Sequence, residues 1–182
     1  MQLSTITLFY LTAIVAAFPV EKRQGAAAIF ATTTYDEISI SGGTAGNGEA
    51  EALAVFSALD SADPATLSKD DLDFLNEVNQ VANDAETDAF NPAVEAATGA
   101  EADALQVRRF HLSTPWCVCA GKIKNKILKL EATVLKLQAQ QAQGEDVATK
   151  LADEQKKLDN NIATDKKNAG KPSTALPFDA TI

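Results

Sequence analysis

The chain has 182 residues, a formal net charge of −9 and 46% hydrophobic residues, but only 6% aromatic residues. Alanine accounts for 33 residues and explains this combination, because alanine favours helices while burying little surface. The length suits one domain. The composition argues against an aromatic-rich β-sandwich, a disulfide-dense scaffold and a metal site built from several histidines.

Residues 1–17 are expected to form a secretory signal peptide. Their apolar stretch, which begins at Leu8, is shorter than the roughly 20 residues that span a bilayer. Val15 and Ala17 provide small residues at the −3 and −1 positions of a signal-peptidase site. No later apolar run is long enough to predict a transmembrane segment. The sequence therefore predicts a secreted, extracellular protein.

Residues 18–23 are expected to form a short propeptide. The segment ends in the basic pair Lys22 and Arg23, directly after the predicted signal peptide. This arrangement resembles the propeptides that Kex2-type proteases remove in the fungal secretory pathway. The mature chain is then expected to begin at Gln24.

The charges of the mature chain are divided between its two halves. Residues 24–107 contain 16 acidic side chains and a single base, Lys69, whereas residues 108–182 contain 13 bases and 8 acids. Such asymmetry arises when the basic half binds an anionic partner, or when the two halves pack together. We favour the second interpretation.

Residues 24–46 are expected to form a flexible leader followed by a glycine-rich turn. Within them, residues 35–41 alternate enough to predict a short extended segment. The glycines at 42–48 lack the Lys-Ser/Thr pair of a phosphate-binding P-loop, and their spacing does not match Gly-x-Gly-x-x-Gly. We therefore predict a turn, with Asn47 as the N-cap of the first helix.

Helical patterns follow from residue 47 to residue 168. The first helix is marked by Leu53, Phe56 and Leu59 and is interrupted before Pro64. Ser68 stands three residues before Asp71, which is a variant of the capping box and predicts the start of a second helix.

The second helix presents two faces. One is apolar and is expected to join the core: Leu75, Val78, Ala82 and Ala85. The other is a row of carboxylates that we name the acidic stripe: Asp70, Asp73, Glu77 and Asp84. Acidic pairs such as these occur in glycoside hydrolases, but an alanine-rich helix without an aromatic sugar platform favours a solvated face.

A third, short helix is expected to start at Asn91-Pro92 and to end at Gly99, with one or two further turns over 100–107. The strongest periodicity predicts a helical hairpin of 122–142 packed against 145–168. A long two-stranded coiled coil is the competing interpretation, but Gly144 and the break in register favour a hairpin. Residues 169–182 are expected to be a tail.

Catalytic and metal-binding motifs are not evident. Residues 60–71 resemble a calcium loop only faintly, because Ala62 and Pro64 occupy ligand positions and Ala65 replaces the glycine. There is no Gly-x-Ser-x-Gly and no His-Glu-x-x-His sequence. We therefore expect no enzymatic activity, no cofactor and no metal site.

One flank of the first hairpin arm carries a row of lysines that forms a candidate basic surface: Lys122, Lys126, Lys129 and Lys136. Binding of nucleic acid is not expected, since it requires more positive charge and stacking aromatic side chains. An anionic lipid or cell-wall surface is one alternative partner. We instead expect an internal partner, with the acidic stripe as the candidate.

The segment 108–120 differs from the rest of the chain, since it holds the only His, the only Trp and both cysteines. Cys117 and Cys119 are too close in sequence for an easy disulfide and provide too few ligands for zinc. We interpret the segment as an insertion. A retained intron that is translated in frame is one origin of such an insertion. A loop with two reactive thiols and an ordinary loop are the alternatives.

Four segments resemble a family of small secreted proteins of filamentous fungi: residues 35–47, 74–86, 121–126 and 156–161. In relatives with this pattern, the Leu-Gln pair at 105–106 runs almost directly into Gly-Lys-Ile-Lys, which supports the insertion. The resemblance covers most of the chain outside 108–120. It implies secretion and supplies no catalytic residues.

The sequence thus predicts an all-α bundle of about four to six helices, closed by a C-terminal antiparallel hairpin and preceded by a flexible leader. We expect a non-enzymatic secreted protein that acts by surface contact with an unknown protein or cell surface. Its role is that of a host-interaction effector or of a matrix or cell-wall component. The alternative is an extracellular carrier that binds an apolar ligand between its helices, which requires a cavity.

Overall fold

The computed structural model describes residues 27–98 and 115–182. The signal-peptide site at Ala17, the dibasic site at Lys22 and Arg23, and the turns expected over 100–107 lie outside these residues. Within the described part, the chain forms an all-α bundle without strands, which confirms the predicted fold class.

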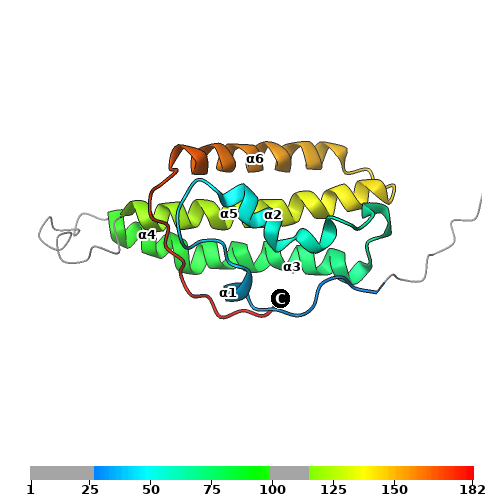
Figure 1. The fold of residues 1–182 in the computed structure, drawn as a ribbon, viewed down its shortest axis with the longest axis horizontal. Coiled ribbons are helices and arrows are strands. Elements are labelled where there is room, and N and C mark those ends of the chain that lie inside the picture. The colour runs from blue at the N-terminus through cyan, green and yellow to red at the C-terminus, as the bar shows by residue number, and fades with distance from the viewer. Residues whose placement is uncertain (1–26, 99–114) are drawn as a thin grey trace, which may run out of the picture.

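Three long helices form the body of the bundle. They are α3 (Lys69–Ala85), α5 (Pro115–Ala142) and α6 (Ala148–Lys167), and α5 lies between the other two (Figure 1). The shorter α2 (Gly48–Val55) packs against α5, and the single turn α1 (Tyr35–Ile38) packs beside α3. The central position of α5 explains why its side chains dominate the core.

The predicted C-terminal hairpin is confirmed. Helix α5 is about 42 Å long and α6 about 30 Å, at about 1.5 Å per residue. The chain reverses at Gly144, whose φ of 94° is a conformation that favours glycine. Apolar side chains of both arms are buried in the bundle: Ile127, Leu130, Val134, Leu137, Leu158 and Ile162.

The start and the apolar face of α3 are also confirmed. The Ser68 hydroxyl accepts a hydrogen bond from the backbone N–H of Asp71 at 3.1 Å, and the Asp71 carboxylate accepts the backbone N–H of Ser68 at 3.2 Å. All four residues of the predicted apolar face are fully buried: Leu75, Val78, Ala82 and Ala85.

The start predicted for the third helix at Asn91 is confirmed, although the chain does not leave the helical conformation before it. Helix α3 continues through a widened π-helical turn, η3 (Glu86–Phe90), directly into α4 (Asn91–Thr98). Pro92 has no backbone N–H, and its ring crowds the preceding turn of an α-helix. The wider turn, in which Asn91 donates to the Glu86 carbonyl, accommodates the proline without ending the helix.

The prediction of a flexible leader is wrong for residues 27–34. The backbone N–H groups of Ile29 and Phe30 donate to the Asp71 carboxylate at 2.6 and 3.3 Å, which fixes the leader to the start of α3. The extended segment expected at 35–41 is instead the helical turn α1, and Tyr35 within it is fully buried.

The alternative that 108–120 is a loop is wrong for its last six residues, which are helical. Pro115 begins α5, and Cys117, Val118 and Ala120 are buried. A Cβ placed on Gly121 would collide with the backbone carbonyl of Thr174. The two backbones approach closely here, which requires small residues. Small residues do not form the apolar periodicity from which a helix is predicted, so the first turns of α5 were not expected.

The first helix differs from the prediction in two details. Leu53 is 47% exposed. The α-helix ends at Val55, and the buried aromatic side chain of Phe56 follows directly after it. The Asn47 side chain makes no capping hydrogen bond. The carboxylate of Asp165, on α6, instead accepts the backbone N–H of Gly48, the first residue of α2, and that of Gly46.

The segment after α6 contains no helix, as predicted for a tail, but it packs along the bundle. It runs from the end of α6 to the region of α1 (Figure 1). Thr33 and Ile182 exchange two backbone hydrogen bonds of 3.0 and 2.8 Å, and Ile182 is buried in the core. Ser173 donates to the Gly43 carbonyl at 2.8 Å. Backbone hydrogen bonds therefore hold the N-terminal and C-terminal segments together on the bundle.

Candidate functional site

The four lysines of the candidate basic surface lie at the interface of α3 and α5. Three of them converge on the carboxylate of Glu86, at Nζ–Oε distances of 2.7 Å for Lys129, 3.1 Å for Lys126 and 3.7 Å for Lys122. Lys136, one to two turns further along α5, donates instead to Asn76 Oδ1 at 2.7 Å.

Asparagines and a threonine complete this interface. Asn79 donates to the Thr133 hydroxyl at 2.7 Å, and Lys129 reaches Asn83 Oδ1 at 3.3 Å. We name the whole set the polar ladder: Asn76, Asn79, Asn83 and Glu86 on one side, and Lys122, Lys126, Lys129, Thr133 and Lys136 on the other. The lysines therefore contact the asparagines and Glu86 and not the acidic stripe.

Glu86 is the electrostatic centre of the ladder. Burial of its side chain would raise its pKa, but hydrogen bonds from Lys129 and Lys126, with the charges of the same two lysines, outweigh burial and lower the pKa of Glu86. A single carboxylate faces three ammonium groups, so the ladder keeps excess positive charge.

The acidic stripe lies on a different face of α3. All four of its side chains are exposed: Asp70, Asp73, Glu77 and Asp84. Lys69, one turn away on the same helix, pairs with Asp73. Neighbouring residues of a helix point about 100° apart, and each asparagine of the ladder stands next to or near a residue of the stripe in sequence. The two rows therefore lie on different faces of α3, and the lysines of α5 meet the asparagines and not the stripe.

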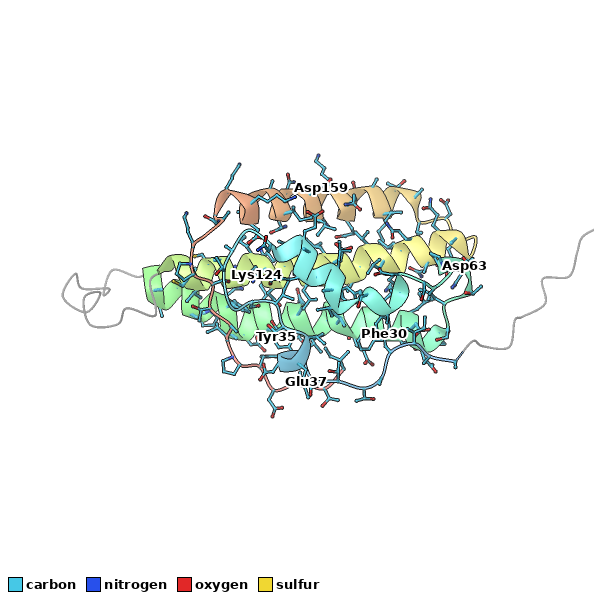
Figure 2. The ribbon with its side chains drawn as sticks, in the orientation of Figure 1. Phe30, Tyr35, Glu37, Asp63, Lys124 and Asp159 are labelled. Carbon is cyan, nitrogen blue, oxygen red and sulfur yellow. The ribbon has the colours of Figure 1, made fainter. Side chains whose placement is uncertain are left out.

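An aromatic hollow borders the acidic stripe. The rings of Phe30 and Phe74 stack with centroids 4.3 Å apart and an interplanar angle of 9°. They line a shallow hollow of about 210 Å³ together with Asp70, Asp73 and Glu77. Phe30 lies on the leader beside α3 (Figure 2). The packed leader therefore adds an aromatic surface to the carboxylates of the helix.

Two polar residues on α5 that are fully buried were not expected. Lys124 is fully buried and pairs with Glu51 at 2.6 Å, and it also donates to the Gly42 carbonyl at 2.6 Å (Figure 2). Asn125 accepts from the Tyr35 hydroxyl at 2.6 Å and donates to the Ala82 carbonyl at 2.8 Å. A sequence signal existed for Lys124, since it stands four residues before the core residue Leu128.

The Asp165 side chain lies at the start of α2 and contacts the glycine-rich turn. Its Oδ2 atom accepts the N–H groups of Gly46 at 2.9 Å and of Gly48 at 2.8 Å, which places a carboxylate at the start of α2. Because Asp165 comes from α6, this contact joins the glycine-rich turn to the hairpin. The role of the glycine-rich turn in this fold is thus structural, since it connects α2 to the C-terminal hairpin.

The structure offers little room for an apolar ligand. The apolar hollow between Leu59, Pro64, Leu67 and Leu135 measures about 70 Å³, far below the roughly 300–1,000 Å³ of pockets for small organic ligands. A larger hollow of about 190 Å³ lies between α3, α5 and α6, but most of its lining is polar. The carrier interpretation gains no support from either hollow.

The cysteines and the acidic clusters show no metal chemistry in the described residues. Cys117 and Cys119 lie on α5 and form no disulfide. Across residues 27–98 and 115–182, no group of three or more His, Cys, Asp or Glu side chains is arranged to hold a metal ion. None of the helices in the same residues combines the length and apolar character needed to cross a bilayer.

Comparison with known proteins gives a family without an assigned activity. No curated protein and no solved structure matches the chain. A family model described as a domain of unknown function, DUF8454, matches residues 30–177, which include every helix of the bundle. The chain therefore belongs to the DUF8454 family.

Proposed function

We propose that this chain is a non-enzymatic secreted protein of a filamentous fungus that acts by surface contact, as a host-interaction effector or as a matrix or cell-wall component. Its contact surface consists of the acidic stripe and the adjoining aromatic hollow. Its partner is a protein surface or peptide rich in lysine and arginine. The signal-like residues 1–17 and the resemblance of four segments to fungal secreted proteins support secretion.

The observation that carries this proposal is the exposure of the acidic stripe. Its charge is not neutralised inside the fold, because the lysines of α5 contact Glu86 and Asn76 instead. The Lys69–Asp73 pair is solvent-exposed, and such pairs contribute only about 0–1 kcal/mol. The stripe therefore remains available to a partner of opposite charge.

The aromatic hollow favours a cationic side chain over a simple counterion. A guanidinium or ammonium group in the hollow would meet carboxylates at Asp70, Asp73 and Glu77 and the aromatic surface of Phe30 and Phe74. Ion pairing and cation–π attraction then act on the same group, the second contributing about 0.5–1 kcal/mol at exposed sites. Arginine suits this combination best, because its planar group stacks as well as pairs.

Charge-neutral substitution tests the surface. A triple variant, Asp70→Asn, Asp73→Asn and Glu77→Gln, is compared with a control triple in and before α6, namely Asp146→Asn, Asp153→Asn and Asp159→Asn. Asp159 lies on α6, away from the stripe (Figure 2). Both triples change the net charge equally, so only the location of the lost charge differs.

The measurement is the affinity for an arginine-rich peptide at several salt concentrations. We expect the stripe variant to bind at least about tenfold more weakly and the control triple to bind as the wild type does. We also expect wild-type binding to weaken with salt, since exposed charges are screened beyond about 8–10 Å. Equal loss in both triples would show that only net charge matters and would overturn the assignment, as would the absence of binding.

A further inference from the structure

A polar pocket lies at the end of the polar ladder, between α3, α5 and α6. It encloses about 190 Å³, and its floor is the buried side chain of Leu75. Its walls carry six polar side chains, two of them lysines: Asn76, Asn79, Thr133, Lys136, Lys150 and Glu154. Three helices thus contribute to a single hollow that the surface proposed above does not include.

Hydrogen-bond donors in this pocket exceed acceptors. Lys136 uses one of its three N–H groups on Asn76 Oδ1 at 2.7 Å. Lys150 forms no ion pair or hydrogen bond with the described residues, and the side-chain amide nitrogen of Asn76 has no partner among them either. These donors come from all three helices and line one hollow.

The positive charge of the pocket is not neutralised by the protein. The carboxylate of Glu154, at the pocket wall, pairs with Lys157 at 2.9 Å. Burial lowers the pKa of Lys136, and the charge of Lys150 lowers it further, while the charges of Asp73 and Glu145 act in the opposite direction. Two ammonium groups therefore repel each other across a space that an anion can fill.

We propose that this pocket binds a phosphate group, with Lys136 and Lys150 as its charged donors and Asn76 as a neutral donor. A phosphate monoester carries a charge of about −1.5 to −2 near neutral pH, which matches the two lysines, and has three acceptor oxygens. The pocket holds less than the roughly 300 Å³ of sites for larger organic ligands, so the ligand is free phosphate or phosphate on a small polyol.

The lining also indicates how the pocket would distinguish these two sources. Asn79 and Thr133 already bond to each other at 2.7 Å, so they form a fixed polar wall. Glu154 adds an acceptor at the side of α6, which would repel a second anionic group but could accept a hydroxyl donor. A phosphorylated polyol is therefore expected to bind more tightly than inorganic phosphate.

Calorimetric titration of the full folded chain tests the proposal with inorganic phosphate and glycerol 1-phosphate as separate probes. The variants are Lys150→Gln and Lys136→Gln. The control is Lys156→Gln, an exposed lysine of the same helix that does not line the pocket. Lys150 has no structural partner among the described residues, so its variant is expected to fold even if the Lys136 variant does not.

We expect saturable binding of at least one probe in the micromolar to millimolar range. Each pocket variant is expected to weaken that binding about tenfold or more, because it removes a charge-assisted hydrogen bond to the phosphate. The control is expected to bind as the wild type does. Absence of binding by both probes, or equal weakening in all three variants, would overturn the proposal.

Discussion

Glu131 provides the sharpest test of the energetics of this bundle. It lies on α5, is only 7% exposed and forms no ion pair or hydrogen bond with the described residues. Burial, followed by the negative charge of Glu49 on α2, raises the pKa of Glu131 from 4.5 to about 6. The folded protein therefore holds a proton on Glu131 that the unfolded chain releases at lower pH.

The sign of the effect follows from proton linkage. Between pH 4.5 and 6 the folded state binds more protons than the unfolded state, so the free energy of unfolding falls as pH rises. The full difference corresponds to about 2 kcal/mol. Partial solvent access to the carboxylate reduces this value, so we expect about 1–2 kcal/mol of stability to be lost above pH 6.

The variant Glu131→Gln keeps the shape of the side chain but removes its titration. We expect equal stability of variant and wild type near pH 4, and about 1–2 kcal/mol greater stability of the variant at pH 7. Urea unfolding followed by far-UV circular dichroism at several pH values measures both. Because other acids affect both proteins equally, the difference between the two curves isolates Glu131.

A second variant identifies the cause. Glu49→Gln removes the neighbouring negative charge and leaves Glu131 buried, so part of the pH dependence is expected to remain. It also breaks the exposed Lys166–Glu49 pair, which costs at most about 1 kcal/mol. Parallel stability curves for wild type and Glu131→Gln between pH 4 and 7 would refute the reasoning.

Three further predictions concern packing, the polar ladder and processing. Gly121→Ala is expected to lower stability by about 1–3 kcal/mol in thermal unfolding, because its Cβ collides with the backbone of the C-terminal segment; an unchanged melting temperature would contradict that contact. Glu86→Gln is expected to cost about 1–3 kcal/mol in urea, while the exposed control Glu95→Gln costs less than about 0.5; equal effects would deny the ladder its role. N-terminal sequencing of the secreted form is expected to find Gln24, and finding Phe18 would remove the propeptide.

The sequence was most informative where a local rule decides the structure. The capping box of Ser68 and Asp71 and the hairpin turn at Gly144 depend on residues within a few positions of each other. The same locality explains a partial success, because Pro92 correctly marks the start of α4 but does not show that the preceding helix continues into it. Only the π-helical turn before it, which the tertiary packing of α3 and α4 on α5 supports, allows the helix to continue.

The remaining errors involve contacts between residues distant in the sequence. Nothing near Ile29 shows that its N–H will donate to Asp71, 42 residues later, so the leader was expected to be flexible. Periodicity likewise placed the lysines of α5 on one flank but could not identify Glu86 as their partner. A pattern defines the face of a helix, and only the assembled bundle defines what that face meets.

The polar ladder also has a consequence for the uniqueness of the fold. Alanines such as Ala82 and Ala132 give the interior smooth, closely approaching helices, whose apolar contacts change little when one helix slides along another. Hydrogen bonds and ion pairs are specific to position: a shift of α5 by one turn would separate Lys136 from Asn76 and move Glu86 away from its lysines. The ladder thus fixes the position of α5 along the axis of α3. It selects one alignment of the two helices among several that bury similar amounts of apolar surface.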